Sequence, residues 1–305
     1  MHDLAILYEH PEWFKPLFAA LERRGVDYVA LRPDGDWDPA ALTPPARVVL
    51  SRIAMSAFLR GAGGFGEHPI FYAAALLDHW ARAGARVLNG AGVIAIDASK
   101  ARQLSLLSGL GLAVPATRVV HRAEDVPAAA QAIGFPLVVK ANIGGAGAGI
   151  VRFDNLHELR AVIADGDLPV SVDGVLLVQD YVPARGGTIT RIETLDRAYL
   201  YALDIAGGGA FDLCPADACV AEGTPIQLRS AEPPAELRAA AEAVARTLDL
   251  NVGGVEVMID DRDGVARFYD INALSNFVAK PLEILGWDPH ERLVDYLVTQ
   301  IEGTR

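Results

Sequence analysis

Two carboxylates and an amide are the side chains in this sequence best placed to do chemistry together. Asp270 and Asn272 stand two positions apart in a predicted strand, and because side chains alternate between faces, both project from the same side. Pairing across the preceding turn sets Glu256 of the neighbouring strand directly opposite Asp270. Mg²⁺ favours such an all-oxygen cluster, usually with substrate phosphates completing its coordination.

The predicted pairing depends on the turn Arg262-Asp263-Gly264. This segment is typical of a three-residue hairpin loop with Gly in the left-handed position. Opposing Asp261 to Val265 around the loop, and continuing the register, brings Glu256 to Asp270.

The same carboxylates would also suit an acidic, solvated face on an edge hairpin. Against that alternative, the strands look buried, and buried carboxylates need a partner. We therefore favour a metal site. The apolar residues that make these strands look buried are Val255, Val257, Phe268 and Ile271.

A run of small residues, Gly144–Gly149, follows a predicted buried strand that ends at Lys140. Glycine-rich backbone can wrap around a polyphosphate and direct several N–H groups at it. The run is not a P-loop, which would need Gly-Lys-Ser/Thr, and it is not a Rossmann fingerprint, which would open a helix. Val151-Arg152-Phe153 afterwards looks like a returning strand, so we expect a hairpin tip. A flexible surface turn is the alternative, and the loop alone does not decide between the two.

Two lysines carry charge in unusual places. Lys140 concludes the apolar run Leu137–Lys140, so its ammonium must reach solvent or meet an anion. Lys100 stands in the first turn of a predicted helix, where the macrodipole disfavours a cation unless a phosphate lies nearby. Each lysine alone is more often a surface residue than a ligand.

Composition narrows the classes of partner. The chain has 305 residues, 51% of them hydrophobic, which suffices for the cores of two or three subdomains. Its net charge of −12 argues against nucleic acid or an anionic membrane as partner. The first residues show no signal-peptide pattern, and the longest apolar run, Phe71–Leu77, is too short to span a bilayer.

Cysteine usage points to the cytoplasm. Only Cys214 and Cys219 are present, which is typical of a reducing compartment and not of a disulfide framework. They would make half of a metal site, but no second Cys or His pair follows at suitable spacing.

Strands and helices alternate along the chain, which predicts an α/β fold with a parallel, helix-flanked sheet at the N-terminus. We expect an N-terminal α/β domain at 1–96, a central subdomain at 97–180 and a C-terminal subdomain at 181–305. Expected strands include Leu4–Tyr8, Val26–Leu31, Arg47–Ser51, Val175–Tyr181 and Tyr199–Ile205; expected helices include Pro11–Arg24, Phe71–Ala83, Ala123–Ile133, Pro234–Leu248 and Pro289–Glu302.

The order of motifs, more than any one of them, resembles the ATP-grasp fold, with a preceding α/β domain. Within that fold the chain is most similar to the ligases that attach glutamate to ribosomal protein and to related amino-acid ligases. The resemblance runs from about Val48 to the C-terminus. Its motifs are Asp-Ala-Ser-Lys100, Gly-Leu-Ala-Val-Pro-Ala-Thr117, Pro-Leu-Val-Val-Lys140 with its small-residue loop, Leu-Val-Gln-Asp-Tyr-Val182, Gly-Gly-Val-Glu256 and Tyr-Asp-Ile-Asn272.

The resemblance implies a role for each matching residue. Lys100 and Lys140 would hold the ATP phosphates, and Arg191 would face the reacting phosphoryl group. The adenine hinge would be Gln179, Asp180, Tyr181 and Val182; the phosphate-covering loop would include Gly144, Gly145 and Gly147; the Mg²⁺ ligands, typically for two ions and with Mn²⁺ as an alternative metal, would be Glu256, Asp270 and Asn272; and Arg52 and Asn276 would face the acceptor substrate.

The sequence departs from the family pattern at four places. Ile189 stands where an acid usually holds the ribose, and Asp270 is one methylene shorter than the usual Glu. The segment 210–217 replaces a basic one, which removes positive charge near the phosphates or the acceptor. Ser275-Asn276-Phe277 replaces the usual Pro-Gly.

The predicted activity is that of an ATP-dependent carboxylate–amine ligase that forms an acyl phosphate, releases ADP and then forms an amide. Positioning and charge neutralisation suffice for this chemistry, so no protein nucleophile is needed. His68 would be a candidate base, but a lone His in a Gly-rich loop is more often structural. A kinase acting on a small-molecule hydroxyl and a non-catalytic nucleotide-binding module are the alternatives.

The expected substrates are a small-molecule carboxylate and an amine, either amino acid or peptide. The sequence leaves open which acid and amine react, whether the acceptor is free, peptidyl or carrier-bound, and whether the chain forms a homo-oligomer.

Overall fold

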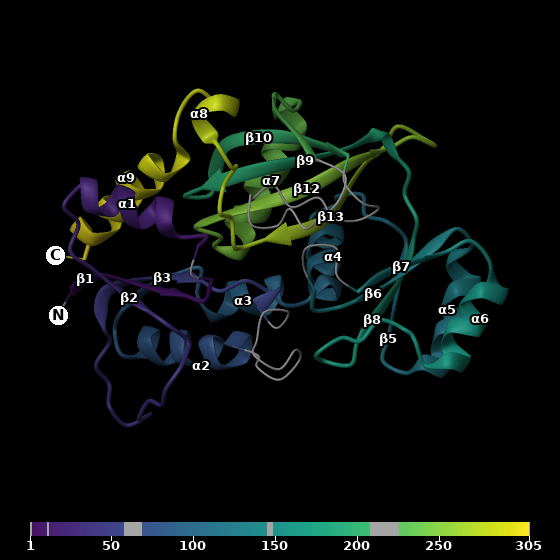
Figure 1. Cartoon of the computed structure of the whole chain (residues 1–305), viewed down its shortest axis with the longest axis horizontal. Coiled ribbons are helices and arrows are strands. Elements are labelled where there is room, and N and C mark those ends of the chain that lie inside the picture. The colour runs from purple at the N-terminus through teal and green to yellow at the C-terminus, as the bar shows by residue number, and fades with distance from the viewer. Residues whose placement is uncertain (1, 11, 58–68, 145–148, 208–225, 305) are drawn as a thin grey trace.

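Three β-sheets form the frame of the molecule (Figure 1). The computed structural model describes residues 2–10, 12–57, 69–144, 149–207 and 226–304. His68, Cys214, Cys219, Gly145 and Gly147 lie outside the described residues. Among the described residues, no helix has both the length and the apolar character needed to cross a bilayer.

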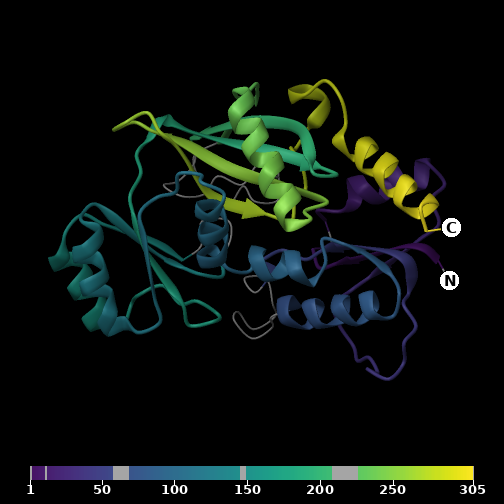
Figure 2. The same ribbon diagram turned by 180° about the vertical axis from the view of Figure 1, so that it is seen from behind.

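The N-terminal sheet is parallel, with strand order β2-β1-β3-β4. Strand β1 (His2–Tyr8), one of the two central strands, carries an unbroken apolar run, Leu4–Leu7, as expected of a parallel strand covered on both faces. Helix α2 packs on one face, and α1 and the C-terminal helix α9 pack on the other (Figure 2). The elements are β1 (His2–Tyr8), α1 (Lys15–Arg23), β2 (Tyr28–Leu31), β3 (Ala46–Arg52), α2 (Pro69–Arg82), β4 (Arg86–Leu88) and α3 (Ala91–Asp97).

The central sheet is antiparallel, with strand order β5-β8-β6-β7. Helices α5 and α6 cover one face and share a core with it, which includes Val139, Val178 and Leu159. The elements are β5 (Thr117–Val120), a short 3-10 turn (Ala123–Asp125), α5 (Val126–Ile133), β6 (Leu137–Ala141), β7 (Ile150–Phe153), α6 (Leu156–Asp165) and β8 (Leu176–Asp180).

The C-terminal sheet is also antiparallel, with strand order β11-β10-β9-β12-β13. Its elements are α4 (Lys100–Gly109), β9 (Ala184–Leu195), β10 (Ala198–Gly207), β11 (Ile226–Ala231), α7 (Ala235–Leu248), β12 (Val252–Asp260) and β13 (Ala266–Asn272), followed by α8 (Pro281–Ile284) and α9 (Pro289–Glu302). Helices α7 and α4 pack on one face in a core with Val255 and Ile271.

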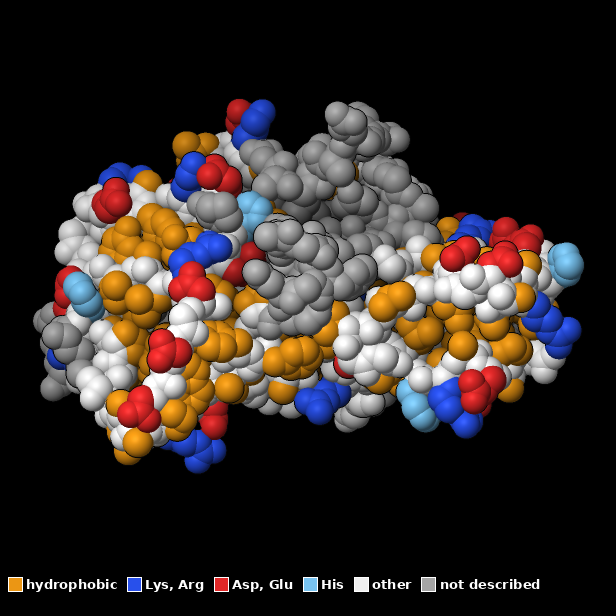
Figure 3. Space-filling view, turned by 60° about the horizontal axis from the view of Figure 1, so that its bottom comes forward, with side chains coloured by type: hydrophobic (Ala, Val, Ile, Leu, Met, Phe, Trp, Pro, Cys, Tyr) orange, Lys and Arg blue, Asp and Glu red, His pale blue; other side chains and the backbone are white. Residues whose placement is uncertain are grey.

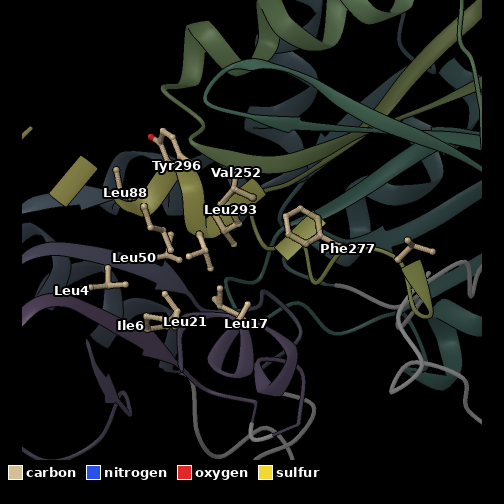
Figure 4. Packing of buried hydrophobic residues seen from close by; sticks show 14 of the residues in the cluster. Leu4, Ile6, Leu17, Leu21, Leu50, Leu88, Val252, Phe277, Leu293 and Tyr296 are labelled. Atoms are coloured by element: carbon tan, nitrogen blue, oxygen red, sulfur yellow. The ribbon is translucent and has the colours of Figure 1, made fainter. Parts of the chain in front are cut away.

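The opposite face of the C-terminal sheet is turned toward the N-terminal sheet. Tyr201 and Leu203 belong to one core with Ile6 and Leu50 of the N-terminal sheet and with α1 and α9. Figure 4 shows Val252 of the same core near Leu50 and Leu293. Side chains on this face therefore lie between the two sheets.

The surface carries both signs of charge. On the face shown in Figure 3, Lys and Arg side chains of the described residues lie beside Asp and Glu, and hydrophobic side chains gather between them over the N-terminal sheet and its helices. Ion pairs among the described residues include Arg82 with Asp78 and Arg122 with Asp125.

The predicted hairpin is present, but the strand pairing that we expected next to its turn is wrong. Ile259 pairs with Ala266, one residue away from the expected pairing, because Gly264 N–H donates to Asp260 and Asp260 N–H donates to Val265. A β-bulge between Glu256 and Val257 then shifts the register by one residue and places Glu256 opposite Asp270, as predicted. Gly264 has the expected positive φ of 75°.

Candidate functional site

Two rows of residues that include four charged side chains cross the centre of the C-terminal sheet, on the face turned toward the N-terminal sheet. Residues that pair across strands share a face, and residues two apart in a strand do as well. The first row is Leu203, Arg191, Glu256 and Asp270; the second row is Tyr201, Glu193, Gly254 and Asn272.

Glu256 lies at the centre of the first row. Its Oε1 accepts hydrogen bonds from Nη1 of Arg191 at 3.3 Å and from Nδ2 of Asn272 at 3.2 Å. Burial, together with the nearby Asp270 carboxylate, raises the pKa of Glu256, while Arg191 and the Tyr269 hydroxyl act against that rise. Because of the β-bulge, Tyr269 has no partner opposite it in β12. Its hydroxyl is hydrogen-bonded to Glu256.

Lys100 reaches Asp270 from the first turn of α4. Its Nζ lies 2.5 Å from Oδ1 of Asp270, and both side chains are largely buried. Burial disfavours the charge on Lys100, but the attraction and hydrogen bond to Asp270 outweigh it and raise the pKa. The backbone N–H of Lys100 also donates to the carbonyl of Asn142, which ties α4 to the loop after β6.

Lys140 is a buried cation in β6, only 4% exposed. Within the described part of the chain its ammonium has neither a hydrogen-bond partner nor an ion pair. Burial and the nearby charge of Lys100 lower the pKa of Lys140 to about 7. A phosphate group is the natural complement of two lysines held close together.

Arg191 and Glu193 form a second ion pair beside the first row. Nε of Arg191 donates to Oε1 of Glu193 at 2.7 Å, and both side chains are buried. A Cβ at Gly254 would lie 2.9 Å from Nε of Arg191 and 3.0 Å from Oε1 of Glu193, so the absence of a side chain there makes room for the pair. Sequence reasoning missed Glu193, although its position two residues after Arg191 places it on the same face.

Asp97 is a further carboxylate that sequence reasoning did not assign to the site. Burial and the charge of Asp270 raise the pKa of Asp97 to about 7, while the N–H of Ala273 donates to it. The carboxylates of the cluster are thus Asp97, Glu193, Glu256 and Asp270, and its cations are Lys100, Lys140 and Arg191.

Oxygen donors in this cluster suit a hard divalent cation. The described residues contain no group of three or more His, Cys, Asp or Glu side chains at metal-binding distance. Two carboxylates and an amide are nevertheless sufficient for Mg²⁺, which keeps water and phosphate oxygens as its other ligands. Since Nδ2 of Asn272 donates to Glu256, its Oδ1 is left to accept or to coordinate. The side chains of Glu256, Asp270 and Asn272 therefore suit an Mg²⁺ ion.

The predicted adenine hinge joins the central sheet to the C-terminal sheet. Nε2 of Gln179 donates to Thr117, and the Asp180 carboxylate accepts two hydrogen bonds from Arg262, at 3.1 and 2.5 Å. Tyr181 N–H already donates to the carbonyl of Pro136. Among the described residues, the backbone of Val182 makes no hydrogen bond of this kind.

The glycine-rich loop is described only at its ends, Gly144 and Gly149. The strands on either side, β6 and β7, pair as an antiparallel hairpin, which confirms the returning strand expected after the loop. Ala141 N–H donates to the carbonyl of Gly149 at the point where the hairpin opens.

Arg52 and Asn276 come from outside the two rows. Arg52 ends β3 and is 2% exposed, with its guanidinium 5.5 Å from the ring centroid of Phe14. Nε and Nη1 of Arg52 and Oδ1 of Asn276 are buried, and none of these atoms has a hydrogen-bond partner within the described part of the chain. The structure records no direct hydrogen bond from either residue to the Glu256 cluster.

These features agree with the comparison of the chain with known proteins. The model of the RimK-like ATP-grasp domain matches residues 97–296, which is well over half of the chain. The chain therefore belongs to the RimK-like ATP-grasp family.

Among curated relatives, a probable alpha-L-glutamate ligase of Ectopseudomonas mendocina (strain ymp) is 29% identical over 195 residues, 63% of this chain and 62% of the relative. A protein of the same name from Pseudomonas putida (strain GB-1) is 32% identical over 127 residues, 41% of each chain. The matches thus span about two fifths to three fifths of the relatives' length.

Solved structures resemble the chain over nearly its whole length. The ATP-grasp ligase PsnB, in complex with a minimal precursor, has a TM-score of 0.70 at 18% identity and covers 98% of this chain and 99% of PsnB. A RimK domain ATP-grasp protein from Sphaerobacter thermophilus DSM 20745 has a TM-score of 0.68 at 21% identity, covering 97% and 99%. The D-cycloserine synthetase DcsG has a TM-score of 0.66 at 19% identity, covering 98% and 99%. The fold is the ATP-grasp fold.

Proposed function

We propose that this chain is an ADP-forming carboxylate–amine ligase. A carboxylate oxygen attacks the γ-phosphorus of ATP to give an acyl phosphate and ADP, and an amine then displaces phosphate to leave an amide. The observation that carries the proposal is the convergence of Arg191, Lys100 and Lys140 on the Glu256–Asp270 pair, from separate elements. This constellation suits phosphoryl transfer, in which catalysis is positioning and charge neutralisation.

Each residue has a distinct task in this scheme. Lys140 and Lys100 bind phosphate oxygens, which requires Lys100 to exchange Asp270 for the nucleotide. Arg191 stabilises the phosphoryl group in transfer. Mg²⁺ held by Glu256, Asp270 and Asn272 would neutralise charge on the phosphates and orient them.

The nucleotide is proposed to lie between the central and C-terminal sheets, with its base at Val182 and its phosphates under the loop at Gly144–Gly149. The division of the chain at 1–96, 97–180 and 181–305 is part of this proposal. The proposal includes two metal ions, because a pair of ions can stabilise both the attacking and the leaving oxygen of a transferred phosphoryl group.

The substrates are proposed to be a small carboxylic acid and an amino acid or peptide amine. The names of the relatives, and a solved structure of PsnB with the precursor peptide PsnA2, support this class. The acidic net charge of −12 supports the exclusion of nucleic acid and anionic membranes as partners, and the two cysteines support a cytoplasmic location.

Trapping with hydroxylamine tests the proposal. Carboxylic acids are screened for ATP-dependent ADP release with hydroxylamine as the amine, and the product is examined for hydroxamate. We expect hydroxamate from the wild type and a rate lower by about 100-fold or more in Asp270→Asn, because the change removes a charge from the phosphoryl-transfer site.

Asp263→Asn is the matched control. Asp263 lies exposed in the turn of the same hairpin and pairs with Arg267, so its loss should leave the rate within about twofold of the wild type. A stable phosphate ester as product would instead identify a kinase. Nucleotide binding without substrate-dependent ADP release would identify a binding module.

A further inference from the structure

The outer side of the Ile271 backbone is bonded by a helix and not by a strand. Strand β13 comes last in the described order of the C-terminal sheet, so no further described strand pairs with its outer edge. Instead, Ile271 N–H donates to Oε1 of Gln103 at 3.0 Å, and the Ile271 carbonyl accepts from Nε2 of Gln103 at 2.9 Å. Because buried backbone groups need partners, this side-chain amide of α4 takes the place of a neighbouring strand.

The amide of Gln103 is buried and makes three hydrogen bonds. Gln103 is 1% exposed, and its Nε2 also donates to the carbonyl of Asp97 at 3.1 Å, where α3 ends. Exchanging the oxygen and nitrogen of the amide would set Nε2 against the Ile271 N–H and Oε1 against two carbonyls, so the three bonds fix its orientation. Gln103 therefore joins α3, α4 and β13 at one point.

Ile271 lies between two of the proposed Mg²⁺ ligands. Its N–H belongs to the peptide unit that begins at Cα of Asp270, and its carbonyl belongs to the unit that ends at Cα of Asn272. Each peptide unit is planar, so holding one polar group restricts the rotation of the whole unit. The two hydrogen bonds between Gln103 and Ile271 therefore restrict the positions from which the Asp270 and Asn272 side chains project.

The same helix carries Lys100. This residue stands three positions before Gln103 in α4, so the two side chains share a face, and Nζ of Lys100 lies 2.5 Å from Oδ1 of Asp270. The first turn of α4 is also held at the loop after β6, because Asn142 accepts the N–H of Lys100 at its carbonyl and the N–H of Ala101 at its Oδ1. A shift of α4 along β13 would thus move the lysine relative to the carboxylate.

We propose that Gln103 is a positioning residue for phosphoryl transfer. It fixes the backbone that carries Asp270 and Asn272, and through α4 it sets their distance from Lys100. The inference rests on the proposed function, in which these residues hold Mg²⁺ and phosphate. Gln103 touches neither the ion nor the substrate in this scheme and acts through the residues that do. Groups that orient metal ligands typically change metal affinity or activity by about 10–100-fold when they are lost.

Nucleotide binding tests the proposal without turnover. Calorimetry gives the Kd for the non-hydrolysable analogue AMPPNP, and the Kd without Mg²⁺ divided by the Kd with saturating Mg²⁺ is here called the Mg²⁺ ratio. This ratio reports the coupling between metal and nucleotide in the site. We expect Gln103→Met to lower the Mg²⁺ ratio by about tenfold, because Met fills a similar space but cannot bond the Ile271 backbone. The Mg²⁺ concentration for half-maximal hydroxamate formation should rise by a similar factor.

Leu107→Ala is the matched control. Leu107 is fully buried one turn further along α4, in the core that includes Ile271, and its truncation leaves a cavity without removing a hydrogen bond from the strand. Its melting temperature should fall, but its Mg²⁺ ratio should stay within about twofold of the wild type. A purely structural role of Gln103 would instead make the two variants alike.

Gln103→Asn is a second variant that preserves polarity. Its amide is one methylene too short to make both bonds to Ile271, and water can satisfy the freed backbone groups so that the fold is kept. We expect it to lower the Mg²⁺ ratio as Gln103→Met does, because the direct link between α4 and β13 is lost in both.

The outcomes separate this inference from the proposed function. A wild-type Mg²⁺ ratio in Gln103→Met or Gln103→Asn, or an equal fall of the ratio in Leu107→Ala, would contradict the positioning role alone. A wild type whose affinity for AMPPNP gains nothing from Mg²⁺ would contradict the metal site, and the positioning role with it. The expected ratios without hydroxamate from any acid would contradict the ligase proposal and support the positioning role.

Discussion

The protonation state of the Lys140 side chain should change when a nucleotide binds. Burial first, and the charge of Lys100 second, lower its pKa from 10.5 to about 7. Between these two pH values the unfolded chain binds more protons at this side chain than the folded protein does. The free protein therefore gains stability from this group as pH rises from about 7, and carries the full penalty of the buried charge below that pH.

Nucleotide binding should consequently take up a proton. At pH 8 Lys140 is mostly neutral in the free protein, and phosphate oxygens beside it restore its charge. We expect the calorimetric enthalpy of ATP binding at pH 8 to vary with the ionisation enthalpy of the buffer in the sense of proton uptake, and to vary less at pH 6. Lys140→Met should remove the uptake at pH 8; equal uptake in wild type and variant would refute the assignment.

Residue types and strand alternation were enough to predict part of the site. Glu256 and Asp270 lie opposite each other, and Asn272 joins them, because these positions obey period-two geometry. The burial of Arg52 and the unused oxygen of Glu193 depend on packing between two separate sheets, which no spacing within the sequence expresses.

At the level of elements, the β12–β13 hairpin depends on two adjacent glycines with different neighbours. A Cβ at Gly253 would lie 2.6 Å from the backbone oxygen of Asn272, which cannot move without disturbing the strand. A Cβ at Gly254 would meet the side-chain ends of Arg191 and Glu193, which can move.

Alanine at the two positions should therefore act differently. We expect Gly253→Ala to reduce the free energy of unfolding by about 1–3 kcal/mol, as overpacked sites do. We expect Gly254→Ala to cost less stability but to lower turnover by about tenfold or more, because it displaces Arg191. Chemical denaturation and hydroxylamine-dependent ADP release measure the two effects. A Gly254→Ala enzyme with unchanged turnover would show that the position of the Arg191–Glu193 ion pair is unimportant for catalysis.

Most elements follow from hydrophobic pattern, and their ends follow from local contacts. The helix expected at Pro11–Arg24 begins only at Lys15, because the His10 ring accepts the N–H groups of Glu12 and Trp13 and holds a turn there. The β-bulge at Glu256 had no sequence signal, yet it restores the predicted pairing of the two carboxylates.

At the level of the whole molecule, long-range packing determines which sheet each element supports. Leu104 and Leu107 of α4 share a core with Val255 and Ile271, so this helix packs on the C-terminal sheet although it precedes the central sheet in sequence. Helix α9 packs against α1 at the other end of the chain. The sequence predicted these helices but not their neighbours.

One ion-pair network connects the central and C-terminal sheets. Arg262, at the tip of the β12–β13 hairpin, binds Asp180 at the end of β8 and also the fully buried Asp260. Hydrogen bonds from Arg262, and then from Arg267, hold the pKa of Asp260 well below its usual range. The network fixes the hinge where the nucleotide base is proposed to lie.

In the acyl-phosphate mechanism, one oxygen of the substrate carboxylate attacks the γ-phosphorus of ATP and later leaves in inorganic phosphate, while the acyl group passes to the amine. The most direct measurement uses the acid found by hydroxylamine trapping, labelled with ¹⁸O in its carboxylate, together with its amine acceptor. Since the oxygen that bonds to phosphorus departs with the phosphoryl group, we expect one ¹⁸O atom in inorganic phosphate for each amide formed. Unlabelled phosphate, or label found in AMP, would contradict the acyl-phosphate mechanism.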